Sequence, residues 1–155
     1  MRAIARGTAV VAACTIVLGC ATSWVRLNDV DDVHHVDTSL SKPEMTEAIV
    51  EGAQNAGWRP KELGNDTILA VFHMRAHVVQ VEIDVGDGFY VTRYQSSREM
   101  KVFCSQRDKE HLRNMKITGR QECPGDVKPT YIHSAYKTWI DSLNSSIQEA
   151  ILAAQ

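Results

Sequence analysis

The feature of the sequence that most constrains the fold is a strict alternation of apolar and polar residues over positions 79–85, within a predicted strand over 77–85. Valine and isoleucine occupy every second position, and Gln80, Glu82 and Asp84 fall between them. Successive side chains of a strand point to opposite faces, so this pattern predicts an antiparallel strand with one buried face and one wetted face. The sequence "GDG" at 86–88 predicts a tight turn directly after it.

Two further strands are predicted on either side of this one along the chain. Residues 67–74, "TILAVFHM", are rich in β-forming side chains, and Arg75–Ala76 is the predicted bend that follows them. Residues 89–94 come after the turn and form the third predicted strand. The three strands together predict an antiparallel meander.

Helices are predicted before and after the meander. Ser41 and Glu44 have the spacing of a capping box and start a helix that Gly57 ends. A longer helix is predicted from Thr130, its N-cap, to the end of the chain. The apolar stripe of this second helix is Ile132, Ala135, Tyr136, Trp139, Leu143, Ile147 and Ile151. The predicted fold is therefore α+β, a two-layer sandwich of a three-stranded antiparallel meander flanked by an N-terminal and a long C-terminal helix.

The N-terminus has the layout of a secretory signal peptide. Arg2 and Arg6 precede an uncharged apolar stretch over residues 7–18, and small residues and Cys20 follow it. The apolar stretch is shorter than the roughly 20 residues that a membrane-spanning helix needs, which disfavours a retained transmembrane anchor. An ordinary signal peptide cleaved nearby remains an alternative.

Val17, Gly19 and Cys20 resemble the end of a bacterial lipoprotein signal. The resemblance implies that residues 1–19 are removed and that Cys20 becomes an acylated first residue, whose lipid chains anchor the protein to a membrane. Ala21 follows the cysteine, where aspartate would be the retention signal for the inner membrane. By that resemblance we expect an outer-membrane lipoprotein that faces the periplasm.

Two cysteines remain once the signal peptide is removed and Cys20 carries lipid. Cys104 and Cys123 then form an even pair in an oxidising compartment, which predicts a disulfide. Such a bond would close a loop of about 20 residues and stabilise the fold by roughly 3 kcal/mol in the chain-entropy model. We expect it to organise an insertion near 101–128. Metal binding by the two cysteines with His111 is the alternative, although the close ligand spacing of zinc sites is absent.

Residues 20–40 read as an acidic tether between the lipid and a domain over 41–155. The sequence "NDVDDVHHVD" is polar, and its valines are too scattered for a helical stripe. Two alternatives stay open for this stretch. Its aspartates and the pair His34–His35 could collect a divalent metal, and Trp24 could belong to an early strand.

Four basic or imidazole side chains form the predicted binding patch: His73, Arg75, His77 and His133. The first three lie around the bend between two strands, and the last lies near the start of the long helix. An arginine flanked by histidines suits recognition of an anionic group. The alternative is that His77 and His133 only hydrogen-bond backbone groups or hydroxyls at element ends.

Residues 45–147 resemble a family of small proteobacterial envelope lipoproteins. The resemblance is carried by the pattern Gly64, Ile68, Ala70, Arg75-x-His77, Val79, Val81, Ile83, Tyr94-x-x-Ser97-x-x-Met100 and Ile132-His133-x-x-Tyr136-x-x-Trp139-Ile140-x-x-Leu143. It implies an envelope location and a fold, and it implies no activity.

The sequence predicts a non-enzymatic, lipid-anchored envelope protein. It carries no nucleophile elbow, no metalloprotease motif, no phosphate loop and no dinucleotide fingerprint, so no catalytic residue, metal or cofactor is assigned. The formal net charge of −2 gives no sign of nucleic-acid binding. Expected partners are the membrane, through the lipid anchor, and an envelope protein, peptidoglycan or a small ligand. The alternative function is a lipoprotein that binds a small ligand or metal through the His/Arg patch.

Overall fold

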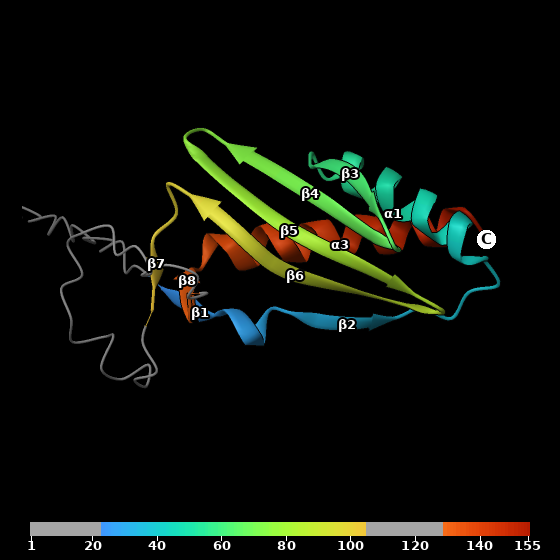
Figure 1. Ribbon diagram of the computed structural model, residues 1–155, viewed down its shortest axis with the longest axis horizontal. Coiled ribbons are helices and arrows are strands. Elements are labelled where there is room, and N and C mark those ends of the chain that lie inside the picture. Colours follow the sequence, from blue (N-terminus) through green and yellow to red (C-terminus); the bar gives the residue numbers. More distant parts are fainter. Residues whose placement is uncertain (1–22, 105–128) are drawn as a thin grey trace, which may run out of the picture.

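Two antiparallel sheets and two helices make up the described part of the chain in the computed structural model, which covers residues 23–104 and 129–155. The larger sheet has five strands in the order β2-β6-β5-β4-β3 (Figure 1). Their bounds are β2 Asp32–His35, β6 Phe89–Arg98, β5 His77–Gly86, β4 Thr67–Met74 and β3 Arg59–Gly64. Strands β4, β5 and β6 form the predicted meander, with β3 and β2 added at its two edges.

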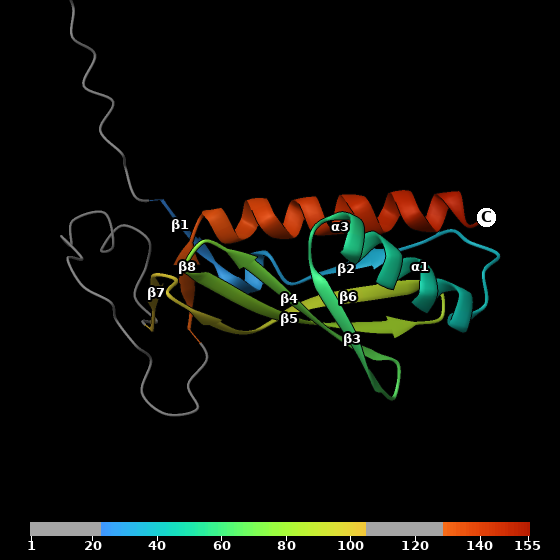
Figure 2. The ribbon, with the colours of Figure 1, turned by 90° about the horizontal axis from the view of Figure 1, so that it is seen from above.

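A small second sheet lies at one end of the molecule (Figures 1 and 2). Its order is β1-β8-β7, with bounds β1 Trp24–Arg26, β8 Tyr131–His133 and β7 Val102–Phe103. A 3-10 helix, η1 Leu27–Asp29, lies between β1 and β2 along the chain. One face of the small sheet packs onto the main core through Val25, Ile132 and Val102.

The two helices of the described chain, α1 Lys42–Asn55 and α3 Ala135–Ala153, pack against each other and cover one face of the five-stranded sheet. Figure 2 shows α3 running along that side of the sheet. The core between the layers includes Ile83 and Tyr90 from the sheet and Leu143 and Ile147 from α3, all inaccessible to solvent. No helix of the described residues is long and apolar enough to cross a membrane.

The local signals at the two ends of α1 and at the turn after β5 predicted their elements correctly. The Ser41 backbone N–H donates to the Glu44 carboxylate at 2.8 Å, which completes the capping box of α1. Gly57 has φ +80° just after that helix, a conformation that suits glycine. The "GDG" sequence forms the turn between β5 and β6, and the valine and isoleucine positions of β5 are buried as expected.

The sheet has five strands where the sequence predicted three. Strand β3 was missed because its residues are charged and include Pro60, a composition typical of an exposed edge strand rather than of an alternating core strand. Strand β2 was missed because it lies within the acidic stretch taken for a tether. Strand β2 is defined by hydrogen bonding to β6, which is distant in sequence, whereas β3 forms a hairpin with the adjacent strand β4.

The predicted tether over 20–40 is folded from residue 24 to residue 35. Strand β1 pairs with β8, and β2 pairs with β6. Leu27 and Val30, between the two strands, are buried against the core. The scattered valines and leucine of this stretch therefore each pack individually against the core. The alternative of an early strand that includes Trp24 is confirmed.

The long C-terminal helix begins at Ala135 and not at Thr130. Residues Tyr131–His133 form β8 instead, because β1 and β7 pair with them on both sides. Most of the predicted insertion, residues 105–128, lies outside the described residues.

Gly52 lies where α1 and α3 approach most closely. A methyl group added there would stand 2.5 Å from the Ile147 Cα and 2.7 Å from the Ser146 carbonyl oxygen. Helix propensity alone would favour alanine by about 1 kcal/mol, whereas forcing the two backbones apart costs about 1–3 kcal/mol. The steric cost should therefore exceed the gain in propensity.

We predict that Gly52→Ala lowers the free energy of unfolding, measured by urea denaturation followed by circular dichroism. The control is Gln54→Ala, an exposed position of the same helix, which should leave stability unchanged or raise it slightly. A Gly52→Ala protein as stable as the wild type would contradict the close helix contact.

Candidate functional site

The structure divides the four predicted patch residues among three places. Met74 pairs in register with His77, and His73 pairs with Val78, so His73 and His77 project from opposite faces of the sheet. Arg75 lies in the exposed turn between them, with φ +55°. Only His77 and His133 come together, at the corner where the two sheets meet.

His77 is held at this corner by backbone and ring contacts. Its Nδ1 lies 2.7 Å from the carbonyl oxygen of Glu99, and its ring lies 6.3 Å from the ring of Trp139 on α3. A carbonyl oxygen only accepts hydrogen bonds, so Nδ1 carries the proton in this contact. The other ring nitrogen, Nε2, is then the lone-pair nitrogen of the neutral imidazole.

His133 has the opposite tautomer. The Ala135 backbone N–H donates to its Nδ1 at 3.1 Å, at the first residue of α3, so a neutral ring carries its proton on Nε2. Burial first, and then the nearby Lys101 and His77, lower the pKa of His133 below its usual value of 6.5. The imidazole of His133 therefore caps α3 in its neutral form.

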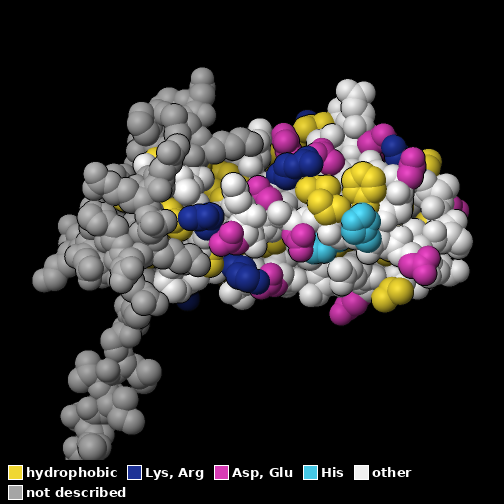
Figure 3. Space-filling model, turned by 90° about the horizontal axis from the view of Figure 1, so that it is seen from below, with side chains coloured by type: hydrophobic (Ala, Val, Ile, Leu, Met, Phe, Trp, Pro, Cys, Tyr) yellow, Lys and Arg dark blue, Asp and Glu magenta, His cyan; other side chains and the backbone are white. Residues whose placement is uncertain are grey.

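The remaining histidine pair, His34–His35, is also split between two faces. His34 stacks on Tyr90 with ring centroids 4.7 Å apart, whereas His35 lies beside Phe89. Burial lowers the pKa of His34, and Asp32 opposes this effect. Figure 3 shows the side of the molecule that carries β2, where histidines lie beside hydrophobic side chains among charges of both signs. No group of three or more metal-ligating side chains occurs within residues 23–104 and 129–155.

The cysteine predictions fall mostly outside the described residues. Cys104 directly follows β7. Cys20 and Cys123 lie outside the part of the chain that the structure describes, so the acylation of Cys20 and the disulfide remain predictions.

A polar cleft of about 350 Å³ lies between the start of α1 and the turn that joins β3 to β4. Lys42 and Asp66 face each other across it at 2.8 Å, and Glu47 and Glu62 add two further carboxylates to its walls. The hydrogen bond to Asp66 raises the pKa of Lys42, with burial opposing and nearby aspartates adding to this effect. The cleft is thus acidic, with its one lysine already paired.

The face of the five-stranded sheet opposite the helices, hereafter the open face, is organised in cross-strand rows. One row runs Lys61–Leu69–Glu82–Arg93, a second Arg59–Val71–Gln80–Ser96, and a third His73–Val78–Arg98. Aliphatic side chains in the middle of the rows are half-buried, and basic side chains stand at the ends.

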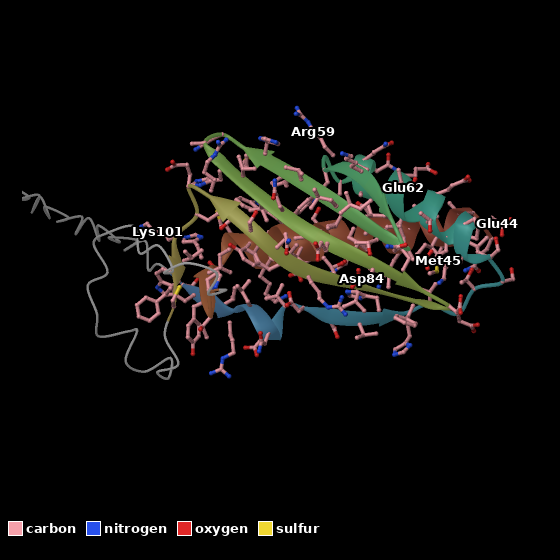
Figure 4. The ribbon with its side chains drawn as sticks, viewed as in Figure 1. Glu44, Met45, Arg59, Glu62, Asp84 and Lys101 are labelled. Atoms are coloured by element: carbon pink, nitrogen blue, oxygen red, sulfur yellow. The ribbon has the colours of Figure 1, made fainter. Side chains whose placement is uncertain are left out.

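Basic side chains outnumber acidic ones on the open face. Four arginine and lysine side chains stand in these rows, against Glu82 and against Asp84 of a further row, Thr67–Asp84–Val91. Asp84 is paired with Arg93. Arg59, Lys61 and Arg98 form no ion pair within the described residues. Figure 4 shows Arg59 projecting from β3 away from the sheet. Because the whole chain has a formal net charge of −2, this basic excess is a local segregation of charge.

Comparison with known proteins gave no match: no family model, no curated protein and no solved structure corresponds to this chain. The basic open face was not predicted from the sequence. A signal for it was present in the alternation of Arg59 and Lys61 with Pro60 and Glu62, but its use requires the register between β3 and β4.

We predict that acidification destabilises the protein partly through His133. The pKa of His133 is lower in the folded chain than in the unfolded chain, so the unfolded state binds more protons as the pH falls below about 6.5. The stability given by the neutral ring is full above that pH and is lost as the pH falls to the lowered pKa of the folded state.

The measurement is the urea midpoint of unfolding at pH 7.5 and at pH 5. His133→Asn keeps an acceptor near Ala135 but does not titrate, so its midpoint should fall less on acidification than that of the wild type. His73→Asn, on the exposed end of β4, is the matched control and should retain the pH dependence of the wild type. Equal pH dependence in His133→Asn and wild type would contradict the prediction.

Proposed function

We propose that this chain is a lipid-anchored bacterial envelope protein that faces the periplasm and binds an acidic partner through its open face without catalysing a reaction. The signal pattern that ends at Cys20 supports the anchor and the location. The resemblance to small envelope lipoproteins is consistent with both. The open face supplies the surface on which binding would occur.

The observation that carries the binding proposal is the segregation of basic side chains on the open face. Arg59, Lys61 and Arg98 surround a middle band of half-exposed aliphatic residues. Such a surface combines apolar area for burial with a positive rim that attracts and orients an acidic partner. Attraction of this kind weakens as salt concentration rises.

A non-catalytic role is supported by how the two neighbouring histidines are used. Each ring directs Nδ1 at a backbone group, His77 at the Glu99 carbonyl and His133 at the Ala135 N–H. Neither histidine is paired with a hydroxyl or thiol that it could activate in the described contacts. These contacts fix the start of β5 and the start of α3, which is a structural use of both rings.

A second candidate function is small-ligand or metal binding at the His77–His133 corner. It is favoured by the proximity of the two rings, which is close enough for His77 to contribute to the lowered pKa of His133. The Nε2 of His77 would accept a hydrogen bond and the Nε2–H of His133 would donate one. Native mass spectrometry of protein from the periplasmic side of cells tests this candidate, because a bound mass lost in His77→Ala would support it and a bare apo mass would contradict it.

We predict that charge reversal on the open face weakens capture of the partner by the anchored protein after crosslinking in cells. Lys61→Glu should reduce the recovered partner, and the triple variant Arg59→Glu, Lys61→Glu, Arg98→Glu should reduce it roughly tenfold or more, since each exposed ion pair contributes about 0.2–1 kcal/mol. Capture by the wild type should also fall in high salt.

Lys137→Glu is the matched control, because it makes the same charge change on the exposed surface of α3. Equal loss of capture in Lys61→Glu and Lys137→Glu would refute the assignment of the open face. Recovery of no envelope component above an unanchored Cys20→Ser protein would count against partner binding altogether.

A further inference from the structure

The distance along the chain between the proposed lipid anchor and the folded domain is very short. Only Ala21, Thr22 and Ser23 separate Cys20 from Trp24, the first residue of β1. Four residue steps of fully extended chain span at most about 14 Å. A lipid on Cys20 would therefore hold the start of β1 within about 14 Å of the anchored residue, whatever the conformation of the intervening chain.

The start of β1 is fixed to the domain. All three of its residues pair with β8. One residue earlier, the Ser23 carbonyl accepts a hydrogen bond from the Ser134 N–H at 3.0 Å, and the two serine hydroxyls lie 2.5 Å apart. The short connection therefore ends on a rigid element, so it constrains the orientation of the whole domain and not only its distance from the membrane.

The side chains of β1 suit the headgroup region of a membrane. Trp24 is half-buried, Arg26 is exposed, and both project from the same face of the strand, with Val25 on the core side. The Arg26 guanidinium lies over the Tyr131 ring, 5.7 Å from its centre, and donates to its hydroxyl at 3.2 Å. Tyr131 itself is buried with Phe103, and Trp24 packs against this pair. Tryptophan concentrates at membrane–water interfaces, and arginine is attracted to anionic lipids.

The acidic cleft and the β1 end lie towards opposite ends of the long axis. Lys101 lies at the end that carries β7, and Glu44 lies at the opposite end (Figure 4). The acidic cleft with Glu47, Glu62 and Asp66 is near the start of α1, at the same end as Glu44. Helix α3 has 19 residues, about 28 Å in length, and runs between the two ends.

We propose that the end of the domain that carries β1 rests on the anionic phospholipid surface, with Trp24 and Arg26 in the headgroup region and the acidic cleft facing away from the membrane. This orientation rests on the lipid anchor of the proposed function. The bilayer is the occupant of this surface because the acylated residue lies only four positions before Trp24. The open face then lies to the side of the molecule and stays accessible to a partner.

The test uses the full chain, processed in cells and reconstituted into vesicles of phosphatidylethanolamine and phosphatidylglycerol that contain brominated lipid. Bromine quenches tryptophan fluorescence at short range. The wild type should lose about a third of its fluorescence, because Trp24 is one of three tryptophans and Trp58 is buried in the core. Trp24→Phe should remove this quenching while leaving the remaining emission unchanged.

A second variant separates docking from simple proximity. Twelve Gly/Ser residues inserted between Thr22 and Ser23 give a flexible spacer of about 20 Å root-mean-square length. We expect quenching of Trp24 to fall at least twofold with this spacer, and to fall further when Arg26→Glu is added. Lys137→Glu on α3 serves as the control for the charge change and should leave quenching unchanged.

The possible failures are distinguishable. A processed protein that does not sediment with membranes lacks the anchor, and this outcome overturns both the proposed function and the orientation. A protein that remains bound to membranes through Cys20 but shows no quenching of Trp24 overturns the orientation alone. Partner capture through the open face is measured separately and does not depend on either result.

Discussion

The register of β5 within the large sheet is the constraint on which the rest of the structure depends. This strand pairs with β4 on one side and β6 on the other, and its valine and isoleucine side chains enter the core, apart from Val78 on the open face. A shift of one residue would turn those side chains to solvent and bring Gln80, Glu82 and Asp84 into the core. The same register places Val81 next to Ala70 and Tyr94 beneath the helices, and therefore decides which side chains the open face displays.

A buried polar contact ties this register to the helix layer. Thr92 lies on β6, opposite Ile83 of β5, and its hydroxyl donates to the side-chain oxygen of Asn144 on α3 at 3.0 Å. Thr92 and Asn144 are both buried. The Tyr90 hydroxyl donates to the Asn144 carbonyl at 3.4 Å. A register slip would leave the buried amide and hydroxyl without partners, at a cost of about 1–3 kcal/mol for each unsatisfied group. These contacts penalise alternative alignments of sheet and helix that apolar packing alone would tolerate.

The sequence was sufficient for elements whose signals are local. The alternation at 79–85, the "GDG" turn, the Ser41–Glu44 capping box and the C-terminal glycine of α1 are all properties of a few neighbouring residues. Strands β2 and β8 were missed because each is made by a partner far along the chain, and β3 was missed because its charged sequence lacks the alternation of a core strand. Strand β8, for example, exists because β1 and β7 flank it, and its sequence Tyr131–His133 otherwise continues a helical stripe.

The predicted histidine patch does not form one surface because the turn between β4 and β5 sets which face of the sheet each side chain projects from. Alternation within one strand would place His73 and Arg75 on the same face, but Arg75 has left the strand with φ +55°. The pairing of Met74 with His77 then places His77 on the core side and His73 on the open face. The face that a side chain occupies after a turn depends on the length and type of the turn, and the sequence "RA" gives no signal for either.

Folding of residues 24–35 changes what the N-terminus can do. A long flexible tether would let the domain adopt any orientation, and a lipid anchor would then fix only its concentration at the membrane. A strand that begins four residues after Cys20 would couple the proposed anchor to the sheet itself. In the proposed orientation the His77–His133 corner lies at the membrane-facing end with β8, whereas the open face extends along the side of the molecule. A soluble ligand would reach that corner only past the lipid headgroups, while a neighbouring envelope protein could approach the open face laterally, which favours partner binding over small-ligand capture.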